Sequence, residues 1–285
     1  MIVAVLTAVI HLIHTAAYSV RLSGVRTGRI ATAFSLFNVI FLLATTANTL
    51  QAPLLASIVE QAMNTGVKEA GGLAGASLVA HPAYQAQLIL IDHQIRLVIA
   101  AAAVGTLAGA FLLPAFVQIF IRAIYIFEET GSVPRMVGGL ILSPRRMKGL
   151  LGQMSLSRRR SLKELTARRL RIPKTFLVLN VLITAIYTIG VLAAIYAAAL
   201  FPDFRTTATT MSAVVNGFAA VLAAMVVDPT VAAITDQAMR GERSEEDVKQ
   251  MTLYLAATRL LGAVLAQAIF VPSAYLIKSV AALLA

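Results

Sequence analysis

The sequence predicts an all-α fold: a polytopic transmembrane helical bundle of about six spans that carries one long basic loop. Of the 285 residues, 59% are hydrophobic and only 13% are charged, whereas soluble domains average about 45–50% and 25%. The mean hydropathy of +0.82 agrees with this. The apolar residues also come in runs of about 20, the length that crosses a hydrocarbon core about 30 Å thick.

The apolar runs predict the positions of the membrane spans along the chain. We expect spans at residues 1–20, 30–50, 97–121, 176–201, 207–227 and 251–271. The first run is not typical of a signal peptide, because its basic residues follow the apolar stretch. Residues 1–285 are therefore predicted to form a single transmembrane domain, with the loop 122–174 inserted between the third and fourth spans. Residues 51–96 are expected to be a loop. The alternative is that this stretch contains a re-entrant segment.

Lysine and arginine are distributed unevenly between the loops. Residues 21–29 hold three of them, residues 122–174 hold thirteen and residues 228–250 hold three, which together make nineteen of the 24 in the chain. Positively charged loops stay in the cytoplasm. We therefore expect an N-out/C-out topology with the loop 122–174 inside the cell.

The basic loop contains arginine clusters between leucines that fall near helical spacing in residues 143–174. This pattern predicts an amphipathic helix against anionic membrane lipids, and a solvated topogenic loop is the alternative. Nucleic acid is not an expected partner, because aromatic residues are not interleaved with the arginines. Further on, Ser244 and Asp247 have the spacing of a helix capping box.

Polar side chains form one-sided stripes inside several predicted spans. The functional interpretation is a polar cavity inside the bundle, because a polar side chain in hydrocarbon usually faces a cavity or another helix. The alternative is hydrogen bonding between helices, worth about 0.6 kcal/mol per pair. The residues concerned are His11, His14, Tyr18, Arg21, Asn38, Thr45, Asn48, Thr49, Asn180, Thr184, Tyr187, Asn216, Arg259 and Gln267.

Besides Arg259, four residues are candidates for ion coupling or for charge pairing within the spans: His14, Asp92, Arg96 and Asp228. Arg259 lies inside an apolar span, where an arginine costs about 2.5–3.5 kcal/mol, so it should have a partner. Asp228 and His14 are the candidate partners, and snorkelling towards the cytoplasm is the alternative. Asp92 and Arg96 are one helical turn apart and are expected to form an i,i+4 ion pair.

Several kinds of chemistry are absent from the sequence. There is no Walker A motif, no H-E-x-x-H and no G-x-S-x-G. The chain has no cysteine, and two histidines alone make a poor metal site, so we expect neither a metal nor another cofactor. An enzyme is disfavoured. Gly105 and Gly109 form a G-x-x-x-G motif that permits close helix contact, either within one subunit or between two.

Specific motifs resemble the bacterial Amj family of alternate lipid II flippases over nearly the whole chain. They are Ile10-His11-Leu12-Ile13, Ala17-Tyr18-Ser19-Val20-Arg21, Gly24-Val25-Arg26-Thr27-Gly28-Arg29-Ile30-Ala31, Ser35-Leu36-Phe37-Asn38, Thr46-Ala47-Asn48-Thr49, Gln51-Ala52-Pro53-Leu54-Leu55, Ser132-Val133-Pro134, Ile172-Pro173-Lys174, Asn216-Gly217, Asp228-Pro229 and Ile234-Thr235-Asp236. The span one–two signature is the most specific. The resemblance implies a multi-pass protein of the bacterial inner membrane that moves undecaprenyl-pyrophosphate-linked precursor to the outer leaflet for cell-wall synthesis and cell shape.

With such a substrate, the polar stripes predict an electropositive cavity open to the cytoplasmic leaflet or the midplane. The candidate substrate-binding residues are Arg21, Arg26, Arg29, Asn48, Gln51 and Arg259. Arginine suits phosphate because its planar fork donates two parallel hydrogen bonds. Six spans are few for so large a substrate, which favours a homodimer.

Two other functions remain open at this stage. A secondary transporter of a small solute or ion, coupled to protons or sodium, would show a closed midplane site at broken helices. An intramembrane enzyme acting on an isoprenoid phosphate would show a nucleophile and a base within hydrogen-bonding reach. A flippase would show a lateral opening towards lipid with arginine inside.

Overall fold

The computed structural model describes residues 1–135 and 172–284, and within these residues all regular structure is helical, which confirms the predicted fold class. Six helical segments of the described residues are long and apolar enough to cross a membrane, as expected. The elements are α1 (Ile2–Ala16), α2 (Ser19–Thr27), α3 (Ile30–Glu69), α4 (Gly75–Ala80), α5 (Pro82–Thr130), α9 (Lys174–Leu200), η1 (Pro202–Phe204), α10 (Arg205–Leu222), η2 (Ala223–Val227), α11 (Asp228–Met239) and α12 (Glu245–Leu284).

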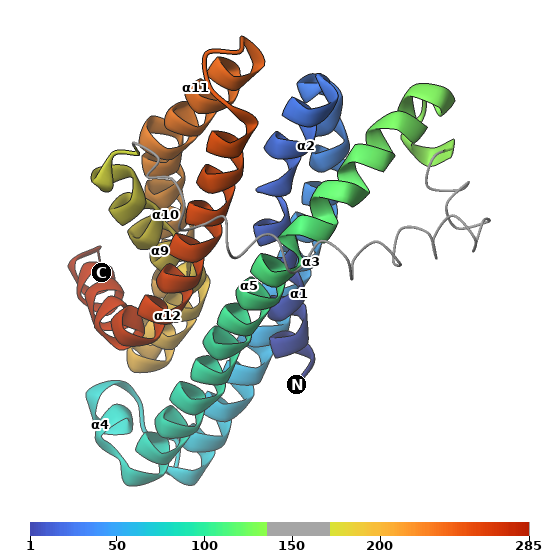
Figure 1. The fold of residues 1–285 in the computed structure, drawn as a ribbon. Helices are drawn as coiled ribbons and strands as arrows, with labels where there is room; N and C mark the ends of the chain where they lie inside the picture. The colour runs from blue at the N-terminus through green and yellow to red at the C-terminus, as the bar shows by residue number, and fades with distance from the viewer. Residues whose placement is uncertain (136–171, 285) are drawn as a thin grey trace.

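The long helices form two groups. Helices α1, α3 and α5 pack together, and α9 packs with α10 and α12 (Figure 1). The groups meet mainly where α12 lies against α5, with smaller contacts of α9 with α3 and α5. The short α2 lies at the same end of the molecule as α11, and the small α4 lies at the opposite end (Figure 1).

The first predicted span is two helices separated by a tight turn at Ala17 and Tyr18. The backbone N–H of Tyr18 bonds the carbonyl of Thr15 at 3.2 Å, and that of Val20 bonds the carbonyl of Ala17 at 3.1 Å, so the turn is locally tightened. The Ser19 hydroxyl bonds the carbonyl of Ala16 at 2.6 Å. Such hydroxyl bonds compete with the helical ladder and bend helices.

Residues 51–96, expected to be a loop, are mostly helical. Helix α3 continues through Pro53 to Glu69, and α5 begins at Pro82, so the two form a hairpin closed by α4 (Figure 1). At 1.5 Å per residue, the 40 residues of α3 extend about 60 Å, twice the thickness of a hydrocarbon core. The expectation of a loop was wrong, because one face of this hairpin is apolar and buried.

The predicted cytoplasmic loop 228–250 is also largely helical. A π-helical turn over Ala223–Val227 connects α10 directly to α11, and the chain turns only between Met239 and Glu245. Pro229 fits at the start of α11, where a missing N–H is tolerated. The predicted capping box is confirmed: Asp247 N–H donates to the Ser244 hydroxyl at 3.3 Å, and Ser244 N–H donates to the Asp247 carboxylate at 3.1 Å.

The G-x-x-x-G motif packs α5 against α1 within one subunit. A Cβ added at Gly105 would lie 2.0 Å from the carbonyl oxygen of Ala8, and one at Gly109 would lie 2.9 Å from that of Leu12. In the second group, a Cβ at Gly262 of α12 would lie 2.6 Å from the carbonyl oxygen of Val181 on α9. Glycine therefore sets the close spacing within each group.

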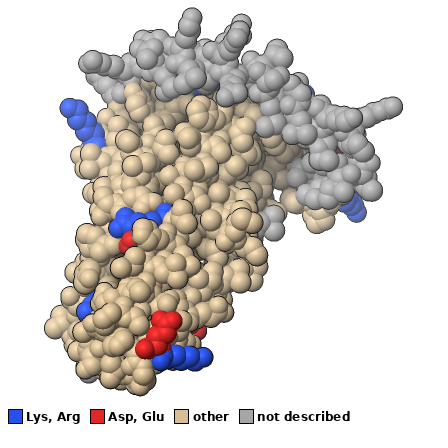
Figure 2. Space-filling view, turned by 90° about the horizontal axis from the view of Figure 1, so that it is seen from below, with Lys and Arg blue, Asp and Glu red and all other residues tan. Residues whose placement is uncertain are grey.

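The end of the molecule that carries α4 is largely uncharged. Figure 2 shows this end as a mostly tan surface on which charged side chains occur in a few separate places. At the opposite end lie the basic residues Arg26, Arg29, Arg240 and Arg243. The amphipathic helix predicted in residues 143–174 falls almost entirely outside the described residues, and the N-out/C-out orientation stays a prediction.

Candidate functional site

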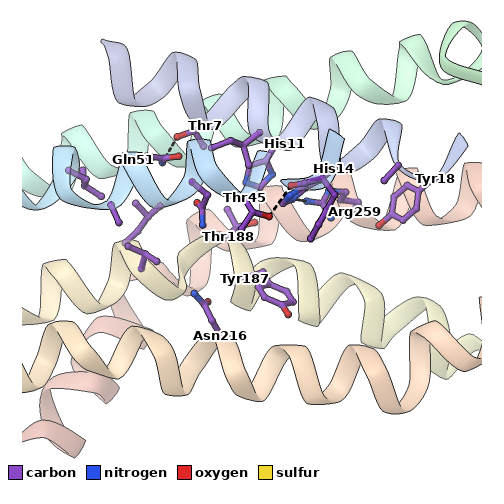
Figure 3. A pocket seen from close by; sticks show the side chains of 18 of the residues that line it. Thr7, His11, His14, Tyr18, Thr45, Gln51, Tyr187, Thr188, Asn216 and Arg259 are labelled. Atoms are coloured by element: carbon purple, nitrogen blue, oxygen red, sulfur yellow. Dashed lines mark hydrogen bonds between the residues drawn. The ribbon is translucent and has the colours of Figure 1, made fainter. Parts of the chain in front are cut away.

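A pocket of about 470 Å³ lies between the two helical groups. Figure 3 shows side chains of α1 and α3 on one side of it and those of α9 and α10 on the other, with Arg259 of α12 between them. Its lining combines apolar residues with the following polar ones: Thr7, His11, His14, Tyr18, Thr45, Asn48, Gln51, Tyr187, Thr188, Asn216, Asp228 and Arg259. The cavity interpretation therefore holds for part of the predicted stripes. It fails for the stripe residues that do not line the pocket, which are Arg21, Asn38, Thr49, Asn180, Thr184 and Gln267.

Arg259 contacts His14 inside this pocket. Its Nη2 lies 3.3 Å from the Nδ1 atom of His14 (Figure 3). Arg259 lies fourteen residues after the first residue of α12, or about 21 Å along the helix. It therefore faces the pocket rather than the Glu245 end of its helix, in contrast to the snorkelling alternative.

This contact defines the hydrogen-bonding state of His14. A guanidinium can only donate, so Nδ1 of His14 must accept, and the proton of the neutral ring then sits on Nε2. The His14 ring stacks on Phe41 with 5.5 Å between ring centroids, which fixes its plane. The Nε2 atom is buried and has no hydrogen-bond partner among the described residues. His14 therefore presents a free N–H donor.

Two further buried polar atoms at the pocket lack a hydrogen-bond partner in residues 1–135 and 172–284. They are the Nε atom of Arg259 and the Oδ1 atom of Asn216. With His14 they make two unused donors and one unused acceptor on residues that line one cavity. Leaving such groups unpaired costs about 1–3 kcal/mol each. Both donors are shielded from solvent, so a ligand would pair with them only after the side chains reorient.

Asp228 lies at the same pocket but does not pair with Arg259. Both residues line the cavity, yet within the described chain no ion pair joins them, and the nearest polar contact of Arg259 is His14. The expected Arg259–Asp228 pair is therefore replaced by the polar contact with His14. Asp228 lies within electrostatic range of Arg21 instead. The guanidinium of Arg259 is left without a carboxylate at contact distance.

Neutral side chains line the rest of the pocket. The Gln51 amide donates to the Thr7 hydroxyl at 2.7 Å, which joins α3 to α1 (Figure 3). Thr7 in turn donates to the carbonyl of Val3 at 2.8 Å. Asn48, one helical turn before Gln51, is exposed at the pocket. Asn48 and Gln51 thus both line the pocket, and their role as neutral substrate contacts stays a prediction.

The other histidine of α1, His11, contacts α5. His11 Nδ1 lies 3.4 Å from the hydroxyl of Thr106 on α5, and that hydroxyl also donates to the carbonyl of Ala102 at 2.9 Å. The ring is thereby held between α1 and α5, with one edge on the pocket. In the described parts of the chain, no group of three His, Cys, Asp or Glu side chains is placed to hold a metal ion.

The three arginines of the α2 region are not among the residues that line the pocket. Arg26 Nε lies 2.6 Å from the carboxylate of Glu245, and Arg29 pairs with Glu128. Arg21 lies over the ring of Phe34, 5.4 Å from its centroid. These contacts tie the α2 end of the molecule together, because they join α2 to α12 and the α2–α3 turn to α5. The carboxylate partners of Arg26 and Arg29 lie about 100 residues or more away in sequence, which local spacing could not reveal.

Asp92 and Arg96 form the predicted i,i+4 pair, but away from the pocket. Arg96 Nε lies 2.8 Å from the Asp92 carboxylate, and its Nη1 donates to the carbonyl of Gln267 at 3.2 Å. The Gln267 amide donates back to the carbonyl of Arg96 at 2.8 Å. The guanidinium also lies 5.8 Å from the centroid of the Phe270 ring. This set of contacts, the α5–α12 clasp, joins the two helical groups.

The pocket is open between α3 and α10. These two helices, both in the described part of the chain, make only marginal contact with each other. Thr45 and Asn48 on α3 and Tyr187 on α9 line the pocket and are exposed. Large exposed apolar side chains lie on other faces of these helices, among them Leu42 and Leu50 on α3, Val214 and Phe218 on α10, and Met225 on η2. In a membrane such residues face lipid, so the pocket opens laterally.

Sequence reasoning missed some contacts of the site. The Thr7–Gln51 bond and the place of Thr188 were not expected, because a threonine in an apolar span carries little signal. Asn180 behaves as the alternative interpretation predicted: it donates to the Thr258 hydroxyl at 2.7 Å between α9 and α12. It is not among the residues that line the pocket.

Comparisons with known proteins give one family. The model of the family described as Amj, "Alternate to MurJ", matches residues 6–281. The chain is 36% identical to the protein named lipid II flippase Amj of Bacillus subtilis (strain 168) over 268 residues, which cover 94% of this chain and 91% of that relative. No solved structure matches the chain.

Proposed function

The chain belongs to the Amj family, and we propose that it is a lipid II flippase of the bacterial inner membrane. It would move the undecaprenyl-pyrophosphate-linked precursor from the inner to the outer leaflet, where cell-wall synthesis uses it. The chain's six candidate spans suit such a multi-pass membrane protein. The observation that carries the proposal is a laterally open pocket that holds an arginine without a carboxylate partner.

A lateral opening suits a substrate with a long lipid tail. The tail can remain against the exposed apolar side chains of α3 and α10 while the headgroup enters the pocket. Moving the charged headgroup through bare hydrocarbon would cost tens of kcal/mol by Born reasoning. The pocket replaces water with fixed donors, which lowers this cost.

We assign Arg259 and His14 as the diphosphate contacts. Arg259 can donate from its guanidinium fork, and His14 can donate from Nε2 because its Nδ1 accepts from Arg259. Without substrate, His14 holds the guanidinium. Asn48 and Gln51 would contact the uncharged sugar and peptide parts from α3.

Arg21, Arg26 and Arg29 would act earlier, at the cytoplasmic entrance. In the proposed orientation α2 lies on the inner side, where its arginines meet the anionic headgroup before the pocket does. Arg21 is within electrostatic range of Asp228, which lines the pocket. Arg21 therefore connects the entrance to the site.

The sequence has no nucleotide-binding motif, so we propose that gradients across the membrane drive the transport. An inside-negative potential of 100 mV favours the outward movement of each negative charge by about 2.3 kcal/mol. The substrate carries at least two such charges on its diphosphate. Asp228 is the candidate coupling carboxylate.

The geometry favours a transporter over an enzyme. Among the described residues, the hydroxyl–imidazole contact of Thr106 with His11 is the nearest approach to a nucleophile–base pair. Thr106 is fully buried and is not among the pocket-lining residues. A homodimer remains part of the proposal, because the pocket is small compared with the whole substrate.

Transport by the purified protein tests this proposal. Labelled lipid II is placed in the inner leaflet of liposomes, and its appearance in the outer leaflet is followed with an impermeant reagent. We expect leaflet exchange that depends on the protein and is faster for lipid II than for a phospholipid of equal charge. Exchange at the protein-free rate, by protein that is folded and inserted, would reject the function.

A further inference from the structure

A second pocket lies between α3, α9 and α10. Its volume is about 210 Å³, and it is lined by Ala56, Val59, Glu60, Met63, Ile195, Ala198, Arg205, Thr206, Thr209 and Thr210. We call this set the outer pocket and the one around Arg259 the inner pocket. In the proposed orientation the outer pocket lies towards the outer leaflet, since it is formed at the first residues of α10.

The two pockets follow each other along the same three helices. On α3 the inner pocket ends at Leu55 and the outer pocket begins at Ala56. On α9 the inner pocket reaches Leu192 and the outer pocket begins at Ile195. On α10 the inner pocket includes Asn216 and the outer pocket runs from Thr210 back to Arg205. Both pockets are therefore bounded by α3 on one side and α10 on the other.

The spacing of the pockets suits a passage across the membrane. Asn216 and Arg205 are eleven residues apart on one helical segment, which corresponds to about 16 Å. This is about half the thickness of a hydrocarbon core. A headgroup that moved from one pocket to the other would cross from the inner half of the bilayer to the outer half.

The outer pocket holds an exposed cation and an exposed carboxylate. In the described residues neither Arg205 nor Glu60 forms an ion pair, although both line this pocket. The hydroxyls of Thr209 and Thr210 already donate to backbone carbonyls of α10, at 2.8 Å and 2.9 Å. Each hydroxyl oxygen can still accept a hydrogen bond, as sugar and peptide groups require.

We propose that the outer pocket is a second, exit-side binding site for a diphosphate-linked lipid headgroup, with Arg205 as its phosphate contact. This inference rests on the proposed flippase function and names a later position of the same substrate. The headgroup leaves the Arg259–His14 contact, slides between α3 and α10, and pairs with Arg205 before release. Glu60 faces the same space and weakens the binding of an anion, which favours release over return.

Single-cysteine variants test this proposal, because the chain contains no cysteine of its own. Thr209→Cys reports on the outer pocket and Thr45→Cys on the inner one. Thr207→Cys, which is not among the lining residues of either pocket, is the matched control. The full chain is purified into nanodiscs, and the rate of labelling by a small maleimide is measured alone and with lipid II, inorganic pyrophosphate or phosphatidylglycerol.

We expect lipid II to slow the labelling of Thr209→Cys and Thr45→Cys but not that of Thr207→Cys. Arg205→Gln should reduce protection at Thr209→Cys about tenfold, the effect of one charge-assisted hydrogen bond, and leave protection at Thr45→Cys in place. Arg205→Lys should retain part of it, and Glu60→Gln should increase it. Protection by inorganic pyrophosphate at high concentration would fit the same diphosphate chemistry.

The possible outcomes distinguish a failure of the proposed outer site from a failure of the proposed flippase function. Protection at Thr45→Cys without protection at Thr209→Cys would overturn the outer site and leave the flippase function standing. Equal protection by phosphatidylglycerol would also overturn it, because any anionic lipid would then suffice. An absence of protection at both positions would count against the proposed function. Since Arg205 is exposed, an unchanged elution profile should show that its variants fold.

Discussion

The two helical groups are closed against each other on one side and open on the other, and an arginine marks each side. On the closed side, Arg96 is bound by Asp92 at 2.8 Å and by the carbonyl of Gln267 at 3.2 Å. On the open side, Arg259 has only His14 at 3.3 Å, and its Nε is unpartnered among the described residues. The same residue type therefore joins the two groups in one place and, in the proposed function, contacts an anion in the other.

Replacing Arg259 should have the largest effect on transport. Arg259→Ala removes the guanidinium and its hydrogen bonds to the diphosphate, about 1.5–3 kcal/mol each, so transport should fall at least about a hundredfold. Arg259→Lys should retain little, because lysine lacks the planar fork. Lipid II transport in liposomes measures this, with membrane abundance as the control for folding. Parental transport by Arg259→Ala would mean that Arg259 is a structural residue.

Breaking the α5–α12 clasp should instead reduce stability. Arg96→Gln leaves the Asp92 carboxylate without its cation, and we expect a loss of about 1.5–3 kcal/mol, seen as a lower midpoint of thermal unfolding. Adding Asp92→Asn should recover part of this loss, because the two effects are coupled. Transport per folded molecule should stay close to parental. A transport defect without a change in the midpoint would show that the closed side also handles substrate.

Glycine substitutions test the helix packing, because one glycine lies at a close contact between helices and another has no close neighbour. Gly105→Ala places a Cβ 2.0 Å from the carbonyl oxygen of Ala8, and separating α1 from α5 should cost about 1–3 kcal/mol. A Cβ added at Gly217 on α10 meets nothing within 4 Å. Because alanine has a higher helix propensity than glycine, Gly217→Ala should be neutral or should stabilise the protein by up to about 1 kcal/mol. Thermal unfolding compares the two variants. Equal midpoints would contradict the described α1–α5 packing.

The smallest effect is expected at an arginine that belongs to neither side. The exposed Arg240 hydrogen-bonds Glu242 at 2.6 Å and lowers the pKa of that carboxyl below its ordinary value. A lowered pKa contributes stability above the unfolded-state pKa, and this contribution disappears as the pH falls through the folded-state pKa. Arg240→Gln should therefore raise the pKa of Glu242, as NMR titration can show, with transport unchanged. An unaltered pKa would mean that the pair is absent in solution.

Hydropathy was enough to predict the six spans, but it did not predict the helical segments that extend beyond them. The sequence predicted a loop over residues 51–96, because the apolar residues there are separated by polar ones. Leu55, Val59 and Met63 follow a helical period and are buried in a core that they share with residues of α5 and α9, so the segment is an amphipathic helix. A hydropathy window averages this face with its polar opposite.

The site was partly predictable because a polar side chain inside a membrane span costs free energy unless it faces a cavity or another helix. This cost pointed to His14, Asn48, Gln51, Asp228 and Arg259, all of which line one pocket. It could not say which cation would be paired. The fold alone brings Glu245 to Arg26 and Glu128 to Arg29. For Arg259 the sequence named Asp228 and His14 as candidate partners, and the structure shows the contact with His14.

The binding of lipid II by the two arginine variants tests the account most directly. The parent, Arg259→Gln and Arg96→Gln are compared in nanodiscs at a temperature well below all three unfolding midpoints. The account predicts that Arg259→Gln weakens binding at least about tenfold, whereas Arg96→Gln binds like the parent. Parental binding by Arg259→Gln, or an equal loss in both variants, would contradict the assignment of the open pocket as the headgroup site.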